Sequence, residues 1–130
     1  MFYYSATQKL AAGEKIKIFN YGNMKRDFTY VDDIVDGISR VVMADNLPLY
    51  DIFNIGNHRS EKLLDVIETL ASVLGVTPKM EMLPMQPGDV YATYASIDKL
   101  RNAVGYKPKT SIKEGIPVFA RWFREYYKLG

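Results

Sequence analysis

Cysteine is absent from the 130 residues, and histidine occurs once. Without cysteine the chain has no disulfide framework and no thiolate to serve as metal ligand or nucleophile. This composition fits a reducing cytoplasm, which is the location we expect. The single histidine, His58, follows an Asn-Ile-Gly-Asn run and has no acidic partner at a fixed spacing. We therefore predict a solvated histidine and no metal site.

Long apolar runs and an excess of one charge are also missing. No stretch approaches the roughly 18 apolar residues that a membrane-spanning helix needs. The 17 basic and 15 acidic residues leave a net charge of +2, so neither nucleic acid nor a membrane surface is an expected partner. Hydrophobic residues make up 48% of the chain, which is enough for a core, and the length predicts a single domain, 1–130.

The nine glycines are scattered, and no two lie three residues apart. The glycine-rich turn that opens a helix and binds the pyrophosphate of NAD is therefore missing. A Tyr-x-x-x-Lys spacing, which on a helix lets the lysine lower the pKa of a catalytic tyrosine, occurs once, at Tyr21 and Lys25. Gly22 and Asn23 between them predict a turn instead of a helix. We assign no catalytic residue and no cofactor-binding residue to this chain.

Hydrophobic periodicity predicts an α+β chain, with helices separated by short strands. The predicted helices are Met1 to Ala12, Asp32 to Ala44, Ser60 to Leu74, Ile97 to Val104, and a last one after Ser111. The predicted strands are Glu14 to Phe19, Tyr50 to Ile55 and Lys79 to Leu83. Ser60 is the predicted N-cap of its helix, and Ser111 with Glu114 has the spacing of a capping box.

Residues 20–33, NYGNMKRDFTYVDD, present an isolated arginine, Arg26, in a loop between two ordered elements. Asp32 and Asp33 lie where carboxylates stabilise the positive end of a helix dipole, and loop hydrogen bonding would also use them. A planar guanidinium is well suited to binding phosphate. Spacing alone favours a plainer role, in which Arg26 pairs with a nearby carboxylate such as Asp27.

Four segments, in this order, resemble the extended short-chain dehydrogenase/reductase superfamily: RDFTYVDDIVDGI (26–38), YDIFNIGN (50–57), MLPMQPGDVYATYASIDK (82–99) and VGYKPKTSIKEGIPVFARWFREYY (104–127). They are spread along the chain, which resembles the carboxy-terminal part of UDP-glucuronate 4-epimerases almost from end to end. The resemblance implies a substrate-binding part that lacks the amino-terminal, NAD(P)-binding Rossmann half. It also implies that residues 50–55 return as one strand to the Rossmann sheet.

The same resemblance implies five substrate-binding residues. Lys17 and Phe19 would run along the uracil, although Phe19 also suits an ordinary core. Arg26 matches an arginine that contacts the diphosphate, and Asp89 an aspartate that accepts hydrogen bonds from ribose hydroxyls. Asp89 equally suits a plain turn after Pro-Gly. Gln86 stands where many UDP-galactose epimerases carry a second phosphate-binding arginine, so it brings a donor without a charge.

For function, the resemblance implies an NAD-dependent nucleotide-sugar epimerase of polysaccharide biosynthesis. The complete enzyme would oxidise the sugar C4 hydroxyl by hydride transfer to NAD and return the hydride to the other face. This chain would hold the UDP end of the substrate, bind no NAD itself, and be inactive alone. Its expected partners are a UDP-sugar and the missing Rossmann half, and apolar surface left exposed would permit a homo-oligomer. Two alternatives stay open: a free-standing UDP-sugar-binding or interaction module, and a fragment of a 4,6-dehydratase or decarboxylase.

Overall fold

The computed structural model describes all residues, 1–130, and is a mixed α+β structure, as the sequence predicts. The elements in chain order are α1 (Phe2–Ala12), β1 (Lys15–Ile18), the 3-10 turn η1 (Phe19–Gly22), β2 (Lys25–Asp27), α2 (Val31–Met43), β3 (Ser60–Lys62), α3 (Leu63–Leu74), β4 (Lys79–Met82), α4 (Asp98–Val104) and α5 (Ile112–Tyr126). Strand β1 pairs in parallel with β4, and β2 pairs antiparallel with β3. No helix is both long enough and apolar enough to cross a membrane.

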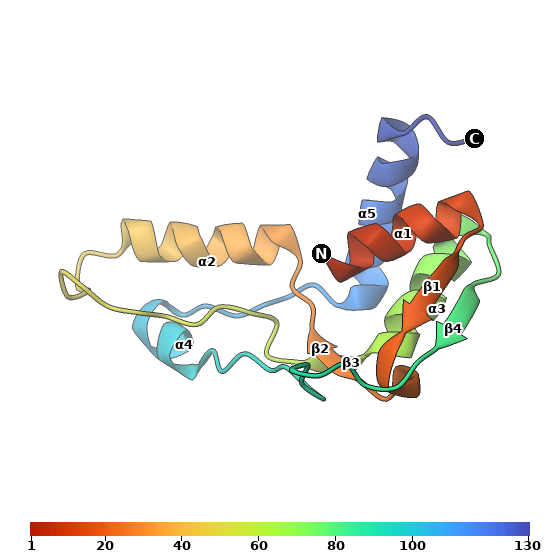
Figure 1. Cartoon of the computed structure of the whole chain (residues 1–130). Helices are drawn as coiled ribbons and strands as arrows, with labels where there is room; N and C mark the ends of the chain where they lie inside the picture. Colours follow the sequence, from red (N-terminus) through yellow and green to blue (C-terminus); the bar gives the residue numbers. More distant parts are fainter.

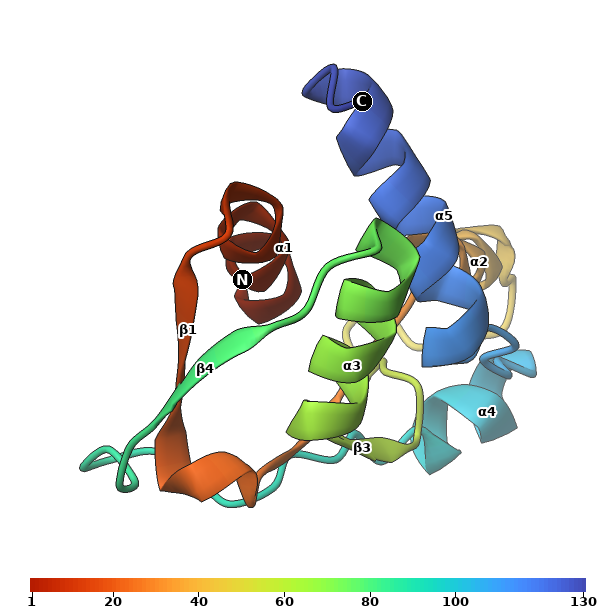
Figure 2. The ribbon, with the colours of Figure 1, turned by 90° about the vertical axis from the view of Figure 1, so that its right-hand side faces the viewer.

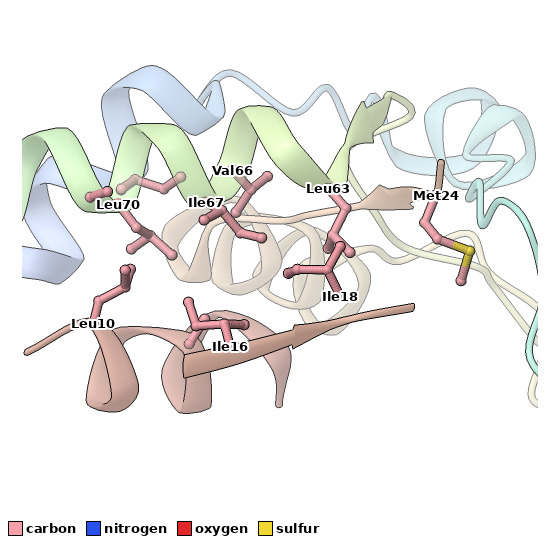
Figure 3. Packing of buried hydrophobic residues seen from close by; sticks show 11 residues of the cluster. Leu10, Ile16, Ile18, Met24, Leu63, Val66, Ile67 and Leu70 are labelled. Carbon is pink, nitrogen blue, oxygen red and sulfur yellow. The ribbon is translucent and has the colours of Figure 1, made fainter. Parts of the chain in front are cut away.

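The larger hydrophobic core lies between α1, α3 and the β1–β4 pair (Figures 1 and 2). On β1 the exposed Lys15 and Lys17 alternate with the buried Ile16 and Ile18, because successive side chains of a strand point to opposite faces. In Figure 3 the apolar residues of α3, including Ile67 and Leu70, face this strand and the side chain of Leu10. Each such aliphatic side chain stabilises the fold by about 1.5–3 kcal/mol when it is fully buried.

Aromatic contacts join the first helix to the last. The ring of Tyr3 meets Phe119 edge-on at 5.0 Å, and that of Tyr4 meets Phe123 at 5.9 Å. Helix α5 therefore explains why α1 carries aromatic residues on more than one side. The predicted capping box at Ser111 and Glu114 is present at the start of α5.

A second, smaller cluster of Ile97, Leu100 and Tyr106 lies beside α2 and α4, on the other side of the molecule in Figure 1. Asp33, in the first turn of α2, is buried and accepts hydrogen bonds from the backbone N–H groups of Lys109 (3.1 Å) and Thr110 (2.9 Å). The predicted use of this aspartate in loop hydrogen bonding is confirmed.

Two local predictions are wrong. Residues 50–55 form no strand: the peptide groups of Phe53, Asn54 and Ile55 make no hydrogen bond, because no neighbouring strand lies beside them. Ser60 is not a helix cap, since it belongs to β3, and its hydroxyl donates to the carbonyl of Thr93. Helix α3 begins instead at Leu63.

Candidate functional site

Arg26 lies in strand β2, which is hydrogen-bonded along both of its edges. On one side it pairs with β3, where Arg26 lies opposite Glu61. On the other side the backbone of Lys25 exchanges hydrogen bonds with Tyr91 (2.9 Å) and Thr93 (3.1 Å). The base of the arginine side chain is therefore fixed by backbone pairing, and the 91–93 segment is held next to it.

The Gln86-Pro87-Gly88-Asp89 segment is a tight turn, closed by a hydrogen bond from the Asp89 N–H to the Gln86 carbonyl at 3.2 Å. Gly88 has a φ of +82°, in the left-handed region that glycine adopts without strain. Proline second and glycine third are typical of a type II turn. Two residues before Tyr91, this turn places Asp89 beside Arg26.

Arg26 and Asp89 form an ion pair, with 2.8 Å between Nη2 and Oδ1. Their side chains are 22% and 30% exposed, so the ion pair is partly accessible to solvent. The Arg26 Nη1 also donates to the carbonyls of Lys25 (2.7 Å) and Tyr91 (3.3 Å). The plainer prediction, an ion pair with Asp27, is wrong, since the partner lies 63 residues away in the sequence.

The other three predicted site residues gather less tightly. Lys17 is exposed on β1, and Phe19 is half-buried in η1 directly after it. The loop that leads to Gln86 starts beside this strand end, because the N–H of Leu83 donates to the Ile18 carbonyl at 2.8 Å. The side chains of Lys17 and Gln86 form no hydrogen bond or ion pair with Arg26 or Asp89.

Asp27 is a positioning residue, a role that the sequence analysis did not predict for it. Its carboxylate accepts the N–H of Asn57 at 2.9 Å and the N–H of Ala95 at 3.0 Å, and its own N–H donates to the Thr93 hydroxyl at 3.2 Å. It thereby ties the Asn-Ile-Gly-Asn loop and the 93–95 segment to β2. No local pattern marks this role, because both donors are backbone groups from distant segments.

Tyr106 lies close to the segments that Asp27 holds. Tyr106 is fully buried and donates its hydroxyl to the Gly56 carbonyl at 2.8 Å. Burial, and then the negative charges of Asp33, Asp27 and Asp36, raise the pKa of Tyr106 to about 12. It is a structural hydrogen-bond donor and stays neutral at physiological pH.

His58 is not the solvated side chain that we predicted. It is half-buried with a φ of +54°, and its ring contacts the Tyr94 hydroxyl (3.0 Å from Nδ1) and the Ala95 carbonyl (3.2 Å). The chain contains no cluster of three potential metal ligands.

Two cavities lie elsewhere. An apolar groove of about 400 Å³ runs between the start of α1, the segment before α2 and α5, and its lining includes Phe28, Ile116 and Trp122. A more polar cavity of about 480 Å³ is lined by residues such as Asp27 and Thr93. Neither of these two cavities is lined by Arg26 or Asp89.

The residues present do not fit the nicotinamide cofactor. The residues that precede the five helices are Met1, Tyr30, Lys62, Ile97 and Ser111, and none belongs to a glycine-rich turn. Tyr21 lies in η1 with a φ of +52°, whereas Lys25 lies in β2, so their spacing does not place them on one helix. The site places a guanidinium and a carboxylate side by side.

Comparison with known proteins agrees with this architecture. The sequence model of the NAD dependent epimerase/dehydratase family matches residues 2–56. The uncharacterized protein MJ1055 of Methanocaldococcus jannaschii is 45% identical over 125 residues, which are 96% of this chain and 38% of that protein. UDP-glucuronate 4-epimerase 2 of Arabidopsis thaliana is 34% identical over 145 aligned residues, covering all of this chain and 33% of the plant protein.

The chain belongs to the NAD-dependent epimerase/dehydratase family. A crystal structure of UDP-glucuronic acid 4-epimerase from Bacillus cereus, with UDP-glucuronic acid and NAD, superposes with a TM-score of 0.89 at 25% identity. The match covers 98% of this chain and 40% of the Bacillus chain. The 4,6-dehydratase of dTDP-glucose from Bacillus anthracis, at 19% identity and a TM-score of 0.82, shares the fold. The chain thus spans 33% to 40% of the length of these relatives.

Proposed function

We propose that this chain is the UDP-sugar-binding part of an NAD-dependent nucleotide-sugar epimerase of the UDP-glucuronate 4-epimerase type. One observation carries the proposal: the Arg26 Nη2 lies 2.8 Å from the Asp89 Oδ1, and both side chains are partly exposed. Backbone hydrogen bonds hold the segment that carries each residue. A guanidinium binds the diphosphate through charge-assisted hydrogen bonds. The carboxylate accepts hydrogen bonds from the ribose diol. Lys17, Phe19 and Gln86 complete the proposed uracil and diphosphate contacts.

The proposal is tested by titrating the chain with UDP and following backbone amide NMR shifts. We expect saturable shifts at Phe19, Arg26 and Asp89, and affinity at least about tenfold lower in Arg26→Ala. Arg121→Ala is the matched control, because Arg121 is exposed and makes no ion pair. Absence of shifts at millimolar UDP, or an equal loss in both variants, would refute UDP binding at this site.

The missing half of the enzyme is the proposed partner. The 53–55 backbone is extended and unpaired between α2 and α4 (Figure 1), and Ile55 packs against Gly37 of α2. The same helix, α2, exposes Val35, Ile38 and Val42. An unpaired extended segment next to an apolar helix face is suited to pairing with a further strand. We propose that a Rossmann-type sheet covers this face in the complete enzyme, which works in cytoplasmic polysaccharide biosynthesis.

Complementation tests this partner. Mixing the chain with the amino-terminal part of the Bacillus cereus enzyme should give a complex and restore conversion of UDP-glucuronic acid, which neither part performs alone. Val35→Asp should abolish the complex, whereas Val118→Asp on α5, another exposed valine, should not. Turnover by the pure chain with NAD would contradict the assignment of catalysis to the other half. Tight UDP binding without any complex would favour the free-standing binding module.

The reaction type depends on catalytic residues outside this chain, so a 4,6-dehydratase or decarboxylase is a second candidate. The fold it shares with the Bacillus anthracis dehydratase is compatible with that class. The complemented enzyme separates the classes directly, since epimerisation conserves substrate mass, whereas dehydration removes water and decarboxylation removes carbon dioxide.

A further inference from the structure

Strand β4 has a free edge. Its sheet contains only β4 and β1, and β4 lies at the outer side of the molecule in Figure 1. The N–H of Leu83 donates to the Ile18 carbonyl, and the backbone groups of successive residues in a strand point to alternate edges. The N–H and C=O groups of Met80 and Met82 therefore point away from β1. Such a row of unpaired groups is suited to pairing with another strand.

The side chains of β4 divide between the two faces of the sheet. The parallel register places Met80 and Met82 on the face that carries the two buried isoleucines of β1, yet they are 39% and 42% exposed and belong to neither buried cluster. Lys79 and Glu81 lie on the opposite face. The Lys79 ammonium donates to the Gly13 carbonyl at 3.0 Å, and Glu81 forms no ion pair. The edge therefore offers an apolar strip on one face and two opposite charges on the other.

We propose that β4 pairs antiparallel with β4 of a second copy of this chain, about a twofold axis at Met80. Antiparallel pairing of the two free edges permits an axis at Met80, Glu81 or Met82. An axis at Glu81 sets two glutamates opposite each other, which is destabilising, and an axis at Met82 leaves both charged residues opposite apolar ones. The axis at Met80 sets Lys79 of each copy opposite Glu81 of the other. Charge complementarity therefore selects this register.

The same register also joins the backbones and the apolar strips. Met80 exchanges two hydrogen bonds with Met80 of the second copy, and the N–H of Met82 donates to the Pro78 carbonyl of the second copy, as in hydrogen-bonded pairs of an antiparallel sheet. The methionines of both copies then continue the apolar face from one β1 to the other. Because the paired strands are short, the interface is small, and we expect a reversible dimer that forms at high protein concentration.

Disulfide trapping tests the register, since the chain has no cysteine of its own. Met80→Cys places two thiols opposite each other, with Cα atoms about 5.5 Å apart, a separation that a disulfide spans. Met82→Cys leaves the two thiols four positions apart, about 14 Å. We expect mild oxidation to give a disulfide-linked dimer of Met80→Cys and to leave Met82→Cys monomeric. Equal trapping of both variants, or trapping of Met82→Cys alone, would overturn the inference.

Charge exchange tests the contact itself, by sedimentation equilibrium from about 10 μM to about 1 mM chain. Lys79→Glu and Glu81→Lys each create two like-charge contacts per dimer, so each should weaken self-association at least about fivefold. An equal mixture of the two variants restores both opposite-charge contacts and should associate as well as wild type. Glu68→Lys is the matched control, because Glu68 is exposed on α3 and forms no ion pair, and it should change association less than about twofold.

The remaining outcomes would each overturn the inference. One is a wild-type chain that stays monomeric at every concentration. Another is a mixture of Lys79→Glu and Glu81→Lys that associates no better than either variant alone. A dimer that persists in both charge variants and is lost in Val35→Asp would lie on the exposed face of α2 instead of on the β4 edge.

Discussion

Replacing Asp27 by asparagine tests whether one carboxylate holds the segments around the site together. In the wild-type chain the two oxygens accept the N–H groups of Asn57 and Ala95 at 2.9 and 3.0 Å. The amide of asparagine keeps one acceptor and turns an NH2 group toward the other donor. The N–H of either Asn57 or Ala95 then faces the NH2 group of the asparagine and loses its acceptor. A lost hydrogen bond to a charged group, together with an unsatisfied donor, costs about 2–3 kcal/mol.

Urea unfolding followed by circular dichroism measures this cost. We expect Asp27→Asn to lower the free energy of unfolding by about 2 kcal/mol, and Asp27→Ala by more, since it removes both acceptors. Asp45→Asn is the matched control, because Asp45 is exposed and bonded to nothing, and it should stay within about 0.5 kcal/mol of wild type. If Asp27→Asn were as stable as this control, the hydrogen bonds of the Asp27 carboxylate would not stabilise the fold and the reasoning would be refuted.

The same change should also affect the proposed UDP-binding site. The 93–95 segment that Asp27 holds continues to Tyr91, whose carbonyl accepts a hydrogen bond from Arg26. Loosening it should weaken UDP binding even at low temperature, where the variant stays folded. Unchanged UDP affinity in a destabilised but folded variant would mean that the hydrogen bonds of Asp27 do not position the UDP-binding residues.

Two further predictions concern the interior. Ile67→Ala, at a side chain with no exposure, should cost about 2–5 kcal/mol in urea unfolding, whereas Ile52→Ala, at 66% exposure, should cost under about 0.5; equal costs would contradict this placement of the core. Tyr106→Phe removes the bond to Gly56 and should cost about 1–2 kcal/mol at pH 7. Because the folded-state pKa of Tyr106 is raised to about 12, its neutral form stabilises the fold fully below pH 10, and that contribution is lost as pH rises toward 12. The wild-type advantage over Tyr106→Phe should therefore shrink between pH 10 and 12, and a constant difference would refute it.

The helices could be predicted because their signals are local. Gly13, Gly75 and Gly105 follow the last turns of α1, α3 and α4 with φ near +70°, where glycine relieves the strain of a left-handed residue. The alternation at Lys15–Ile18 predicts a strand for a similar reason, since one face is buried within the chain itself. These elements depend on residues that lie close together in the sequence.

The contacts of the site depend on distant segments instead. Spacing predicts that Arg26 pairs with its neighbour Asp27, yet in a strand successive side chains point to opposite faces. Asp27 therefore bonds the 57 and 95 backbone, while Arg26 reaches Asp89. The pairing of Lys25 with Ala92 decides this arrangement, and no spacing within residues 20–33 contains it. Only the family resemblance indicates both Arg26 and Asp89 as site residues, and it does not predict that they form an ion pair.

The unpaired segment at 53–55 differs from the site in what determines its structure. A helix forms its hydrogen bonds within one segment, but a strand exists only with a partner strand. The apolar run at 53–55 therefore predicts that this segment can pair with another strand, and not that it is paired in this chain. By contrast, Arg26 and Asp89 are held by hydrogen bonds made inside this chain, to β3, to the 91–93 segment and within the Gln86–Asp89 turn. The Arg26–Asp89 pair should consequently form without the proposed partner sheet, whereas residues 53–55 should become a strand only when that sheet is present. Amide exchange measures both: protection at Lys25 and Thr93 in the chain alone, and protection at Phe53 and Ile55 appearing only in the complex.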